Sequence, residues 1–221
     1  MIGLFILSFV VSARFKNRFK KYSEVALGAG LSGREIAERM LRDSGIHDVQ
    51  VVSGQGMLSD HYNPLTKTVS LSMDVYNGRS IAAASVAAHE CGHAVQHATA
   101  YAWLQLRSTL VPVVSFANNV TSIVLLIGVI LYFTSQLPYV LLLGVLLLAA
   151  TTLFSFITLP VEYDASNRAL AWLNTTNLTT PGEHVMAKDA LKWAARTYLV
   201  AALASLATLL YYASMLLGSR D

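Results

Sequence analysis

Two histidines and a glutamate lie close together near the middle of the chain, in the order His89-Glu90-Cys91-Gly92-His93. The flanking residues are rich in alanine and contain no proline, so we expect one continuous helix over Ser80–Arg107. Positions four apart share a helix face, and the two imidazoles can therefore bind one zinc ion. Glu90 is placed to take a proton from a water that this metal activates. The pattern is typical of metalloproteases; the alternative is a surface helix that carries two histidines by chance.

A catalytic zinc ion takes three protein ligands and leaves one position for water. Thr99 stands where a metzincin would carry its third histidine, six residues after His93, which excludes that class. His97 shares the helix face, but three imidazoles one turn apart cannot easily converge on one ion, so contact with substrate or with a zinc histidine suits it better. Carboxylates from a later helix remain as candidates: Glu162, Glu183 and Asp164. We favour Glu162, because a carboxylate just beyond an apolar stretch is costly without a function.

The chain around these residues has the composition of an integral membrane protein. Hydrophobic residues make up 54% and charged residues 13%, against about 25% charged residues in soluble domains. The stretches Leu110–Phe133 and Pro138–Leu159 contain no charged residue, and each can cross about 30 Å of hydrocarbon. A short link makes them an antiparallel hairpin, and a third span is expected at Tyr198–Leu217.

The distribution of Lys and Arg predicts the orientation of the chain. Residues 14–109 hold eleven and residues 161–197 hold four, whereas only Arg220 lies beyond the last span. The zinc helix and residues 161–197 therefore share one side, which the positive-inside rule makes the cytoplasmic face of the plasma membrane. Because Glu162 follows the second span so closely, the zinc is expected within about 10 Å of the membrane surface.

Other classes of protein are excluded by the same composition. The single cysteine, Cys91, cannot form an intramolecular disulfide, so nothing indicates an oxidising compartment. The net charge of +3 comes without a basic motif that would bind nucleic acid. The absence of charge over Leu110–Leu159 argues against a transporter or channel.

The N-terminal apolar stretch Ile2–Ala13 is followed by five cations, in the reverse of the order found in secretory signal peptides. These cations are Arg14, Lys16, Arg18, Lys20 and Lys21. The apolar stretch is shorter than the roughly 20 residues that span a bilayer. The alternatives are a short anchor with its N-terminus outside and an interfacial helix; we favour the anchor. Phe15 and Phe19 alternate with the cations, which suits docking on anionic lipid.

A small sheet is expected before the zinc helix, because Asp48–Val52, Met57–Tyr62 and Thr68–Ser72 show strand patterns. An exposed sheet edge can hold an extended substrate by strand addition, although a packing hairpin without that role is an equal alternative. Capping-box patterns predict helices that begin after Ser32 and after Thr180, and the second helix can continue into the last span.

Three motifs resemble those of the YugP-type neutral zinc metallopeptidases of bacteria, and the resemblance covers nearly the whole chain. The motifs are Leu58–Pro64, Ala87–Gln96 and Pro160–Ser166. The resemblance implies a membrane zinc peptidase, related in plan to the HtpX-like gluzincins, with one zinc ion per chain. It matches His89 and His93 to the zinc histidines, Glu90 to the general base and Glu162 to the third ligand.

One position departs from the HtpX-like pattern. In that pattern an Asp follows the ligand Glu by four residues and orients a zinc histidine. Here Ser166 occupies that position and Asp164 lies two residues after Glu162, so either side chain could supply the orienting contact. The donor that would stabilise the oxyanion is also open. The candidates are His61, Tyr62, Tyr163, Arg168 and His97.

These features predict a mainly α integral membrane protein with three to four transmembrane helices and a small zincin-like α+β catalytic part. The expected parts are an N-terminal anchor (1–13), the catalytic part (14–109), a transmembrane hairpin (110–160), a third-ligand segment (161–197) and a C-terminal transmembrane helix (198–221). The activity indicated is zinc-dependent hydrolysis of peptide bonds in membrane or membrane-proximal proteins, with the lipid bilayer as the other partner. The alternative is a zinc-binding membrane scaffold without hydrolytic activity.

Overall fold

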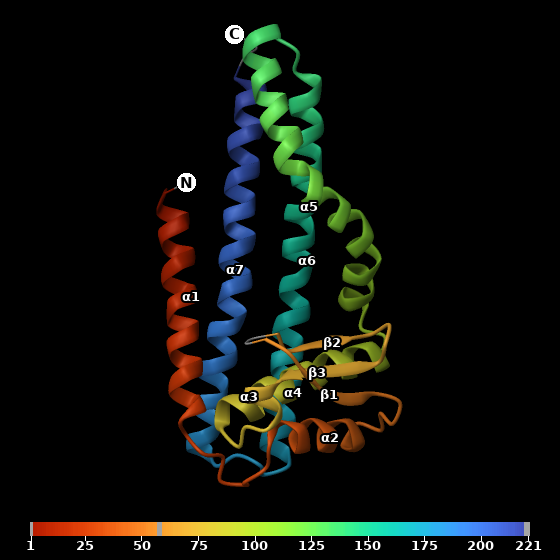
Figure 1. The fold of residues 1–221 in the computed structure, drawn as a ribbon, viewed down its shortest axis with the longest axis vertical. Helices are drawn as coiled ribbons and strands as arrows, with labels where there is room; N and C mark the ends of the chain where they lie inside the picture. Colours follow the sequence, from red (N-terminus) through yellow and green to blue (C-terminus); the bar gives the residue numbers. More distant parts are fainter. Residues whose placement is uncertain (1, 57–58, 219–221) are drawn as a thin grey trace.

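The computed structural model describes residues 2–56 and 59–218 as a bundle of long helices with a small sheet at one end (Figure 1). Helices α5 (Ala102–Ser135), α6 (Tyr139–Thr175) and α7 (Pro181–Leu217) run beside one another away from the sheet. Each of these three helices is long and apolar enough to cross a membrane. The molecule is therefore a mainly α membrane protein with a small α+β part, as the sequence predicts.

Helices α5 and α6 form the predicted hairpin, and a glycine sets how closely they approach. A Cβ atom on Gly128 of α5 would lie 2.6 Å from Cα of Leu141, so only glycine fits at this crossing. Leu125, Leu141 and Val145 are buried around it. Small residues at such crossings let membrane helices pack by close van der Waals contact. Helix α7 joins the hairpin through the Tyr132 hydroxyl, which donates a hydrogen bond of 3.0 Å to a carbonyl oxygen of α7.

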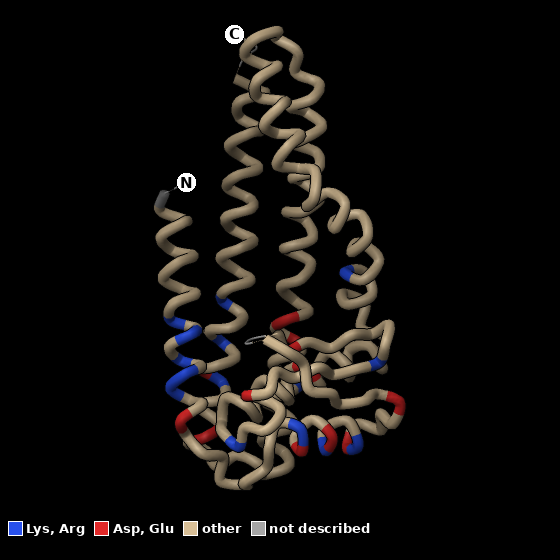
Figure 2. The backbone as a smooth tube through the Cα atoms, viewed as in Figure 1, with Lys and Arg blue, Asp and Glu red and all other residues tan. Residues whose placement is uncertain are grey.

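Charged residues divide the molecule into two halves (Figure 2). Within the described residues, Lys, Arg, Asp and Glu all lie in the half that contains the sheet. Arg107 is the last charged residue of α5 and Glu162 is the first of α6. The apolar half therefore ends close to these two side chains.

Helix α1 (Ile2–Ser23) contains both the apolar stretch and the basic stretch, and it lies beside α7 (Figure 1). Phe5 and Phe9 in its first half are 78% and 71% exposed, which suits contact with lipid. Phe15 and Phe19 are instead partly buried, and Phe19 packs against Tyr22 and the buried alanines of α4 and α7. Docking of these two rings on anionic lipid stays a prediction, and so does the crossing of the membrane by α1.

The sheet contains β1 (Gln50–Gly54), β2 (His61–Asn63) and β3 (Thr68–Ser72), in the order β1-β3-β2. Strand β3 is parallel to β1 and antiparallel to β2. Its alternating pattern buries Val69 and Leu71 completely. Part of the predicted second strand, at Met57 and Leu58, lies outside the described residues. Among the described residues β2 pairs only with β3, so its other side forms an edge of the sheet.

Helices α2 (Gly33–Asp43), α3 (Met73–Tyr76) and α4 (Ile81–Ala98) complete the α+β part. Both predicted capping boxes are present, one before α2 and one before α7. Residues 161–197 form the end of α6, a short turn and the beginning of α7.

The helix predicted over Ser80–Arg107 is shorter in the structure, because α4 ends at Ala98 and residues 102–107 belong to α5. Tyr101 N–H donates to the carbonyl oxygen of Gln96 at 2.9 Å, and Ala100 N–H donates to that of His97 at 3.1 Å. Ala100 adopts a φ of 52°. This is a Schellman ending in which alanine occupies the position that glycine usually takes. The residue types therefore contained no sign of the helix end.

Candidate metal site

The candidate site lies where α4 crosses α6, and Gly92 allows the two helices to touch. A Cβ atom on this residue would lie 2.5 Å from the carbonyl oxygen of Ala165. Glycine is required at such a close backbone approach. Ala88 and Cys91 on α4 are completely buried, which holds this helix firmly in the α+β part. The crossing brings one face of α6 directly opposite the two histidines.

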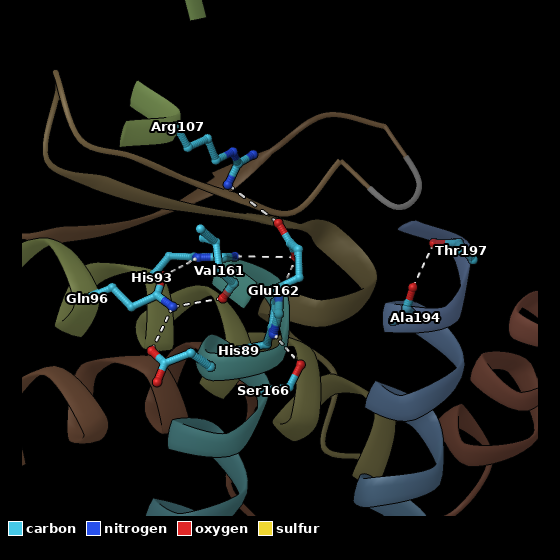
Figure 3. A network of polar contacts seen from close by, with 10 residues as sticks. His89, His93, Gln96, Arg107, Val161, Glu162, Ser166, Ala194 and Thr197 are labelled. Atoms are coloured by element: carbon cyan, nitrogen blue, oxygen red, sulfur yellow. Dashed lines mark hydrogen bonds and ion pairs between the residues drawn. The ribbon is translucent and has the colours of Figure 1, made fainter. Parts of the chain in front are cut away.

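Three side chains converge at this crossing (Figure 3). Glu162 Oε2 lies 3.3 Å from His89 Nε2 and 3.7 Å from His93 Nε2. One potential ligand atom from each residue lies within 4.8 Å of the others. Tetrahedral zinc with bonds of about 2.0–2.1 Å places its ligands roughly 3.4 Å apart. The spacing therefore suits a single metal ion bound by two imidazoles and a carboxylate.

The two carboxylate oxygens of Glu162 have different surroundings. Oε1 accepts a hydrogen bond from Arg107 Nη1 at 3.4 Å. Oε2 is buried and has no hydrogen-bond partner among the described residues, a state that costs free energy for a charged group. A cation between this oxygen and the two imidazole nitrogens would satisfy it. The residues present therefore fit a zinc ion, whose usual ligands include His and Glu.

His93 is oriented by Gln96, a completely buried residue one turn further along α4. The Gln96 amide nitrogen donates to the carbonyl oxygen of Val161 and to Asp164 Oδ2, both at 2.8 Å. Because both partners can only accept, Gln96 Oε1 must face His93 Nδ1, which lies 3.0 Å away. Nδ1 therefore carries the proton, and Nε2 keeps its lone pair toward Glu162 and a metal.

His89 has a simpler anchor, since Ser166 Oγ lies 3.1 Å from its Nδ1 (Figure 3). The two side chains that the sequence left as alternatives thus serve different histidines. Ser166 contacts His89 directly, whereas Asp164 acts on His93 through Gln96. Asp164 is itself held by Arg168 Nε at 2.6 Å.

The electrostatics of His93 favour a bound cation. Burial disfavours its charged form, but the attraction of the neighbouring Glu162 carboxylate outweighs burial and raises the pKa of His93. A metal ion that binds here must displace that proton, so binding releases protons where His93 is still charged.

The other residues predicted for the site take varied positions. His97 lies outside the cluster of three, and its Nδ1 is 2.8 Å from the Tyr62 hydroxyl. Glu183 accepts from backbone N–H groups at the start of α7 and of Gly28. Arg168 is engaged with Asp164, and Tyr163 is 41% exposed.

Two cavities meet at the cluster, and His89, Glu90 and Glu162 line both. The strand-side cavity lies against β2 and α5, where His61, Tyr62 and Arg107 line it. The helix-side cavity lies between α1 and α7 and is lined mainly by apolar residues. Glu90 is thus placed next to any molecule that occupies either space.

Sequence reasoning missed three residues of this site: Gln96, Arg107 and Tyr198. Tyr198 lines both cavities, and the other two make the contacts described above. Gln96 stands in a recognised motif, so its place there was the one available signal. Arg107 lies near the start of α5 and Tyr198 near the middle of α7, and no local pattern marks either residue.

Comparisons with known proteins show which family the chain belongs to. The family model described as "Putative neutral zinc metallopeptidase" matches residues 1–217. The chain is 41% identical over 215 residues to the "Putative membrane protease YugP" of Bacillus subtilis (strain 168), covering 97% of this chain and 94% of that protein. No solved structure matches the chain. The chain thus belongs to this neutral zinc metallopeptidase family, whose model matches nearly the whole chain.

Proposed function

We propose that this protein is a membrane-bound zinc endopeptidase of the gluzincin type that hydrolyses membrane or membrane-proximal proteins. The observation that carries the proposal is the buried, unpartnered Oε2 of Glu162, which faces Nε2 of His89 and of His93. These three residues would hold one zinc ion per chain. When bound, zinc acts as a Lewis acid that activates a water and polarises the scissile carbonyl.

Glu90 is the proposed general base and acid. It follows the first ligand on α4, is mostly buried and lines both cavities. Its carboxylate takes the proton of the attacking water and delivers it to the nitrogen of the leaving amine. The helices α4, α6 and α7 surround the site and limit the access of bulk water. Electrostatic interactions between the catalytic groups and the substrate are stronger where water is excluded.

The substrate chain is proposed to bind along β2. Its outer edge has no strand partner among the described residues, and His61 and Tyr62 on this strand line the strand-side cavity. An extended peptide can add to such an edge through main-chain hydrogen bonds. This arrangement would place the peptide beside His89, His93 and Glu162.

Tyr198 and Arg107 are the proposed donors to the oxyanion. Both line the strand-side cavity together with the three ligands, and Arg107 already contacts Glu162. His61 is a further donor on the strand itself. Tyr163, Arg168 and His97 are less suitable, because they lie outside both cavities.

The site is proposed to lie at the cytoplasmic surface of the plasma membrane. Between Tyr139 and Glu162, α6 is one continuous helix, about 35 Å long at 1.5 Å per residue. That length is close to the roughly 30 Å hydrocarbon thickness. Glu162 therefore stands near the membrane boundary, which favours substrates that are themselves in or near the bilayer.

The test compares zinc content and peptide hydrolysis for the purified wild type, Glu90→Gln and the control Glu38→Gln. Glu38 lies on α2 and pairs with Arg34 at the surface. We expect Glu90→Gln to keep about one zinc per chain and to lose about 10²–10⁴-fold in hydrolysis, because only proton transfer is removed. Near-normal turnover by Glu90→Gln would overturn the mechanism. A zinc-loaded wild type that hydrolyses no peptide would support the scaffold instead.

A further inference from the structure

The helix-side cavity has a volume of about 180 Å³ and opens onto the candidate metal site, since His89 and Glu162 line it. Phe15 and Phe19 of α1 form one wall, and Val86 of α4 and Leu191 of α7 lie beside them. Three small residues of α7 complete the lining and leave the space free: Ala190, Ala194 and Ala195. An engineered apolar cavity of about 150 Å³ can hold a benzene ring. The helix-side cavity can therefore hold a side chain as large as leucine or phenylalanine.

The polar groups in this lining are already engaged within the protein. Thr197 Oγ1 donates to the carbonyl oxygen of Ala194 at 2.7 Å (Figure 3). Ser166 contacts His89, and Asp60 accepts hydrogen bonds from the backbone N–H and the hydroxyl of Ser72. Apart from the catalytic groups and Tyr198 at the shared boundary, the cavity thus offers no free polar partner. Its chemistry selects an apolar occupant.

The strand-side cavity differs in character. Arg107, His61 and Tyr62 contribute charged or polar groups to this cavity alone of the two, and β2 supplies a backbone edge. Because His89, Glu90 and Glu162 belong to both linings, a peptide that crosses the cluster has one flank in each cavity. The two sides of the scissile bond therefore meet different surroundings.

We propose that the helix-side cavity is the specificity pocket, which binds an apolar side chain on one fixed side of the scissile bond. This inference rests on the proposed peptidase function. It makes α1 part of the substrate-binding wall and not only a membrane attachment. Ala194 and Phe15 set the size of the pocket, from α7 and from α1.

The experiment uses full-length, zinc-loaded protein in lipid nanodiscs and a mixed peptide library, with cleavage sites mapped by mass spectrometry. Wild type should cut beside leucine, methionine or phenylalanine on one fixed side. Ala194→Leu, which fills the pocket, should shift that position to alanine or glycine. It should also lower kcat/KM about 10–100-fold for a leucine peptide but not for its alanine counterpart. Phe15→Ala should enlarge the pocket and admit tryptophan.

Ala201→Leu is the matched control, because Ala201 is an exposed alanine on the same helix and lines neither cavity. It should leave the cleavage pattern unchanged. Zinc content near one per chain will show that each variant is folded at the site. If Ala194→Leu and Phe15→Ala both cleave with the wild-type pattern, the pocket assignment is wrong while the peptidase function stands. If zinc-loaded wild type cleaves nothing, the proposed function fails and the pocket assignment fails with it.

Discussion

Helix α6 meets two other helices at glycines, and the two crossings share a packing device but not a setting. At the first crossing Gly92 of α4 lies against Ala165, and at the second Gly128 of α5 lies against Leu141. An added Cβ would come within 2.5 Å and 2.6 Å of the facing backbone, respectively. The first crossing is surrounded by polar side chains, whereas buried leucine and valine surround the second.

The difference shows what close helix contact can be used for. At the α5–α6 crossing, contact buries apolar surface and holds a hairpin together. At the α4–α6 crossing, the same contact fixes distances between side chains that belong to different helices, including the 3.3 Å from His89 to Glu162. Substitutions that disturb the α4–α6 crossing should therefore weaken metal binding. Substitutions that disturb the α5–α6 crossing should instead lower the stability of the fold.

The largest expected effect follows from removing the carboxylate at the α4–α6 crossing. Glu162→Ala should lower zinc content from about one per chain to near zero, because only two ligands remain. Thr152→Ala, ten residues before Glu162 on α6, removes a hydrogen bond to Ser205 of α7 and should keep the zinc. His97→Ala should keep it as well. Elemental analysis of the three purified variants decides the assignment; retention by Glu162→Ala with loss by His97→Ala would contradict it.

The glycines themselves provide the next test. Overpacking a tight contact costs about 1–3 kcal/mol, so Gly92→Ala should push the helices apart and weaken zinc binding up to about 100-fold. Gly128→Ala should lower the melting temperature and leave zinc affinity within about twofold. Chelator competition measures the affinity, and calorimetry in detergent measures the melting temperature. Equal loss of zinc affinity in both variants would remove the distinction between the crossings.

Much of this fold could be predicted from the sequence, because its signals are local. Long apolar stretches without charge identify α5, α6 and α7, and capping-box residues mark the starts of α2 and α7. The early end of α4 could not be predicted, because Ala100 adopts a left-handed conformation without a residue type that favours it. The partial burial of Phe19 depends on packing against Ala82 of α4 and Ala190 of α7, which no local pattern contains.

The residues of the candidate site also divide into those that could be predicted from the sequence and those that could not. The spacing of His89 and His93 follows from helix geometry, so their proximity was predictable. Glu162 could be placed near them only by reasoning about membrane spans and ligand sets, and the structure puts it 3.3 Å from His89. Gln96 could not be found, because its importance lies in contacts with Val161 and Asp164 on another helix.

A smaller effect should separate the two histidines within the α4–α6 crossing. Ser166→Ala removes one hydroxyl from His89 and should weaken zinc binding about tenfold. Gln96→Ala removes the group that orients His93 and also removes the side-chain hydrogen bonds to the Val161 carbonyl oxygen and to Asp164. It should therefore cost closer to 100-fold in affinity. Competitive zinc titrations give the order, and a greater loss for Ser166→Ala would show that Gln96 is not the stronger anchor.

The smallest expected signal is the reactivity of Cys91, which lies beside Gly92 at the α4–α6 crossing. Its side chain is completely buried, and Sγ donates to the carbonyl oxygen of Ala37 at 3.5 Å. Burial raises the pKa of this thiol, and the negative charge of Glu90 adds to the shift. Since the thiolate is the reactive form, wild type should label very slowly with maleimide even at about pH 8.5, where an exposed cysteine is half ionised.

The comparison of the two crossings predicts how that labelling should change. Gly92→Ala loosens the packing around Cys91, so its thiol should gain access to solvent and label several-fold faster. Gly128→Ala disturbs the crossing near the start of α6, far from Cys91, and should leave the labelling rate of Cys91 unchanged below the melting temperature. Mass spectrometry after timed labelling gives both rates, with denatured protein as the full-reactivity reference. Fast labelling of folded wild type would contradict the burial of α4 on which the geometry of the metal site depends.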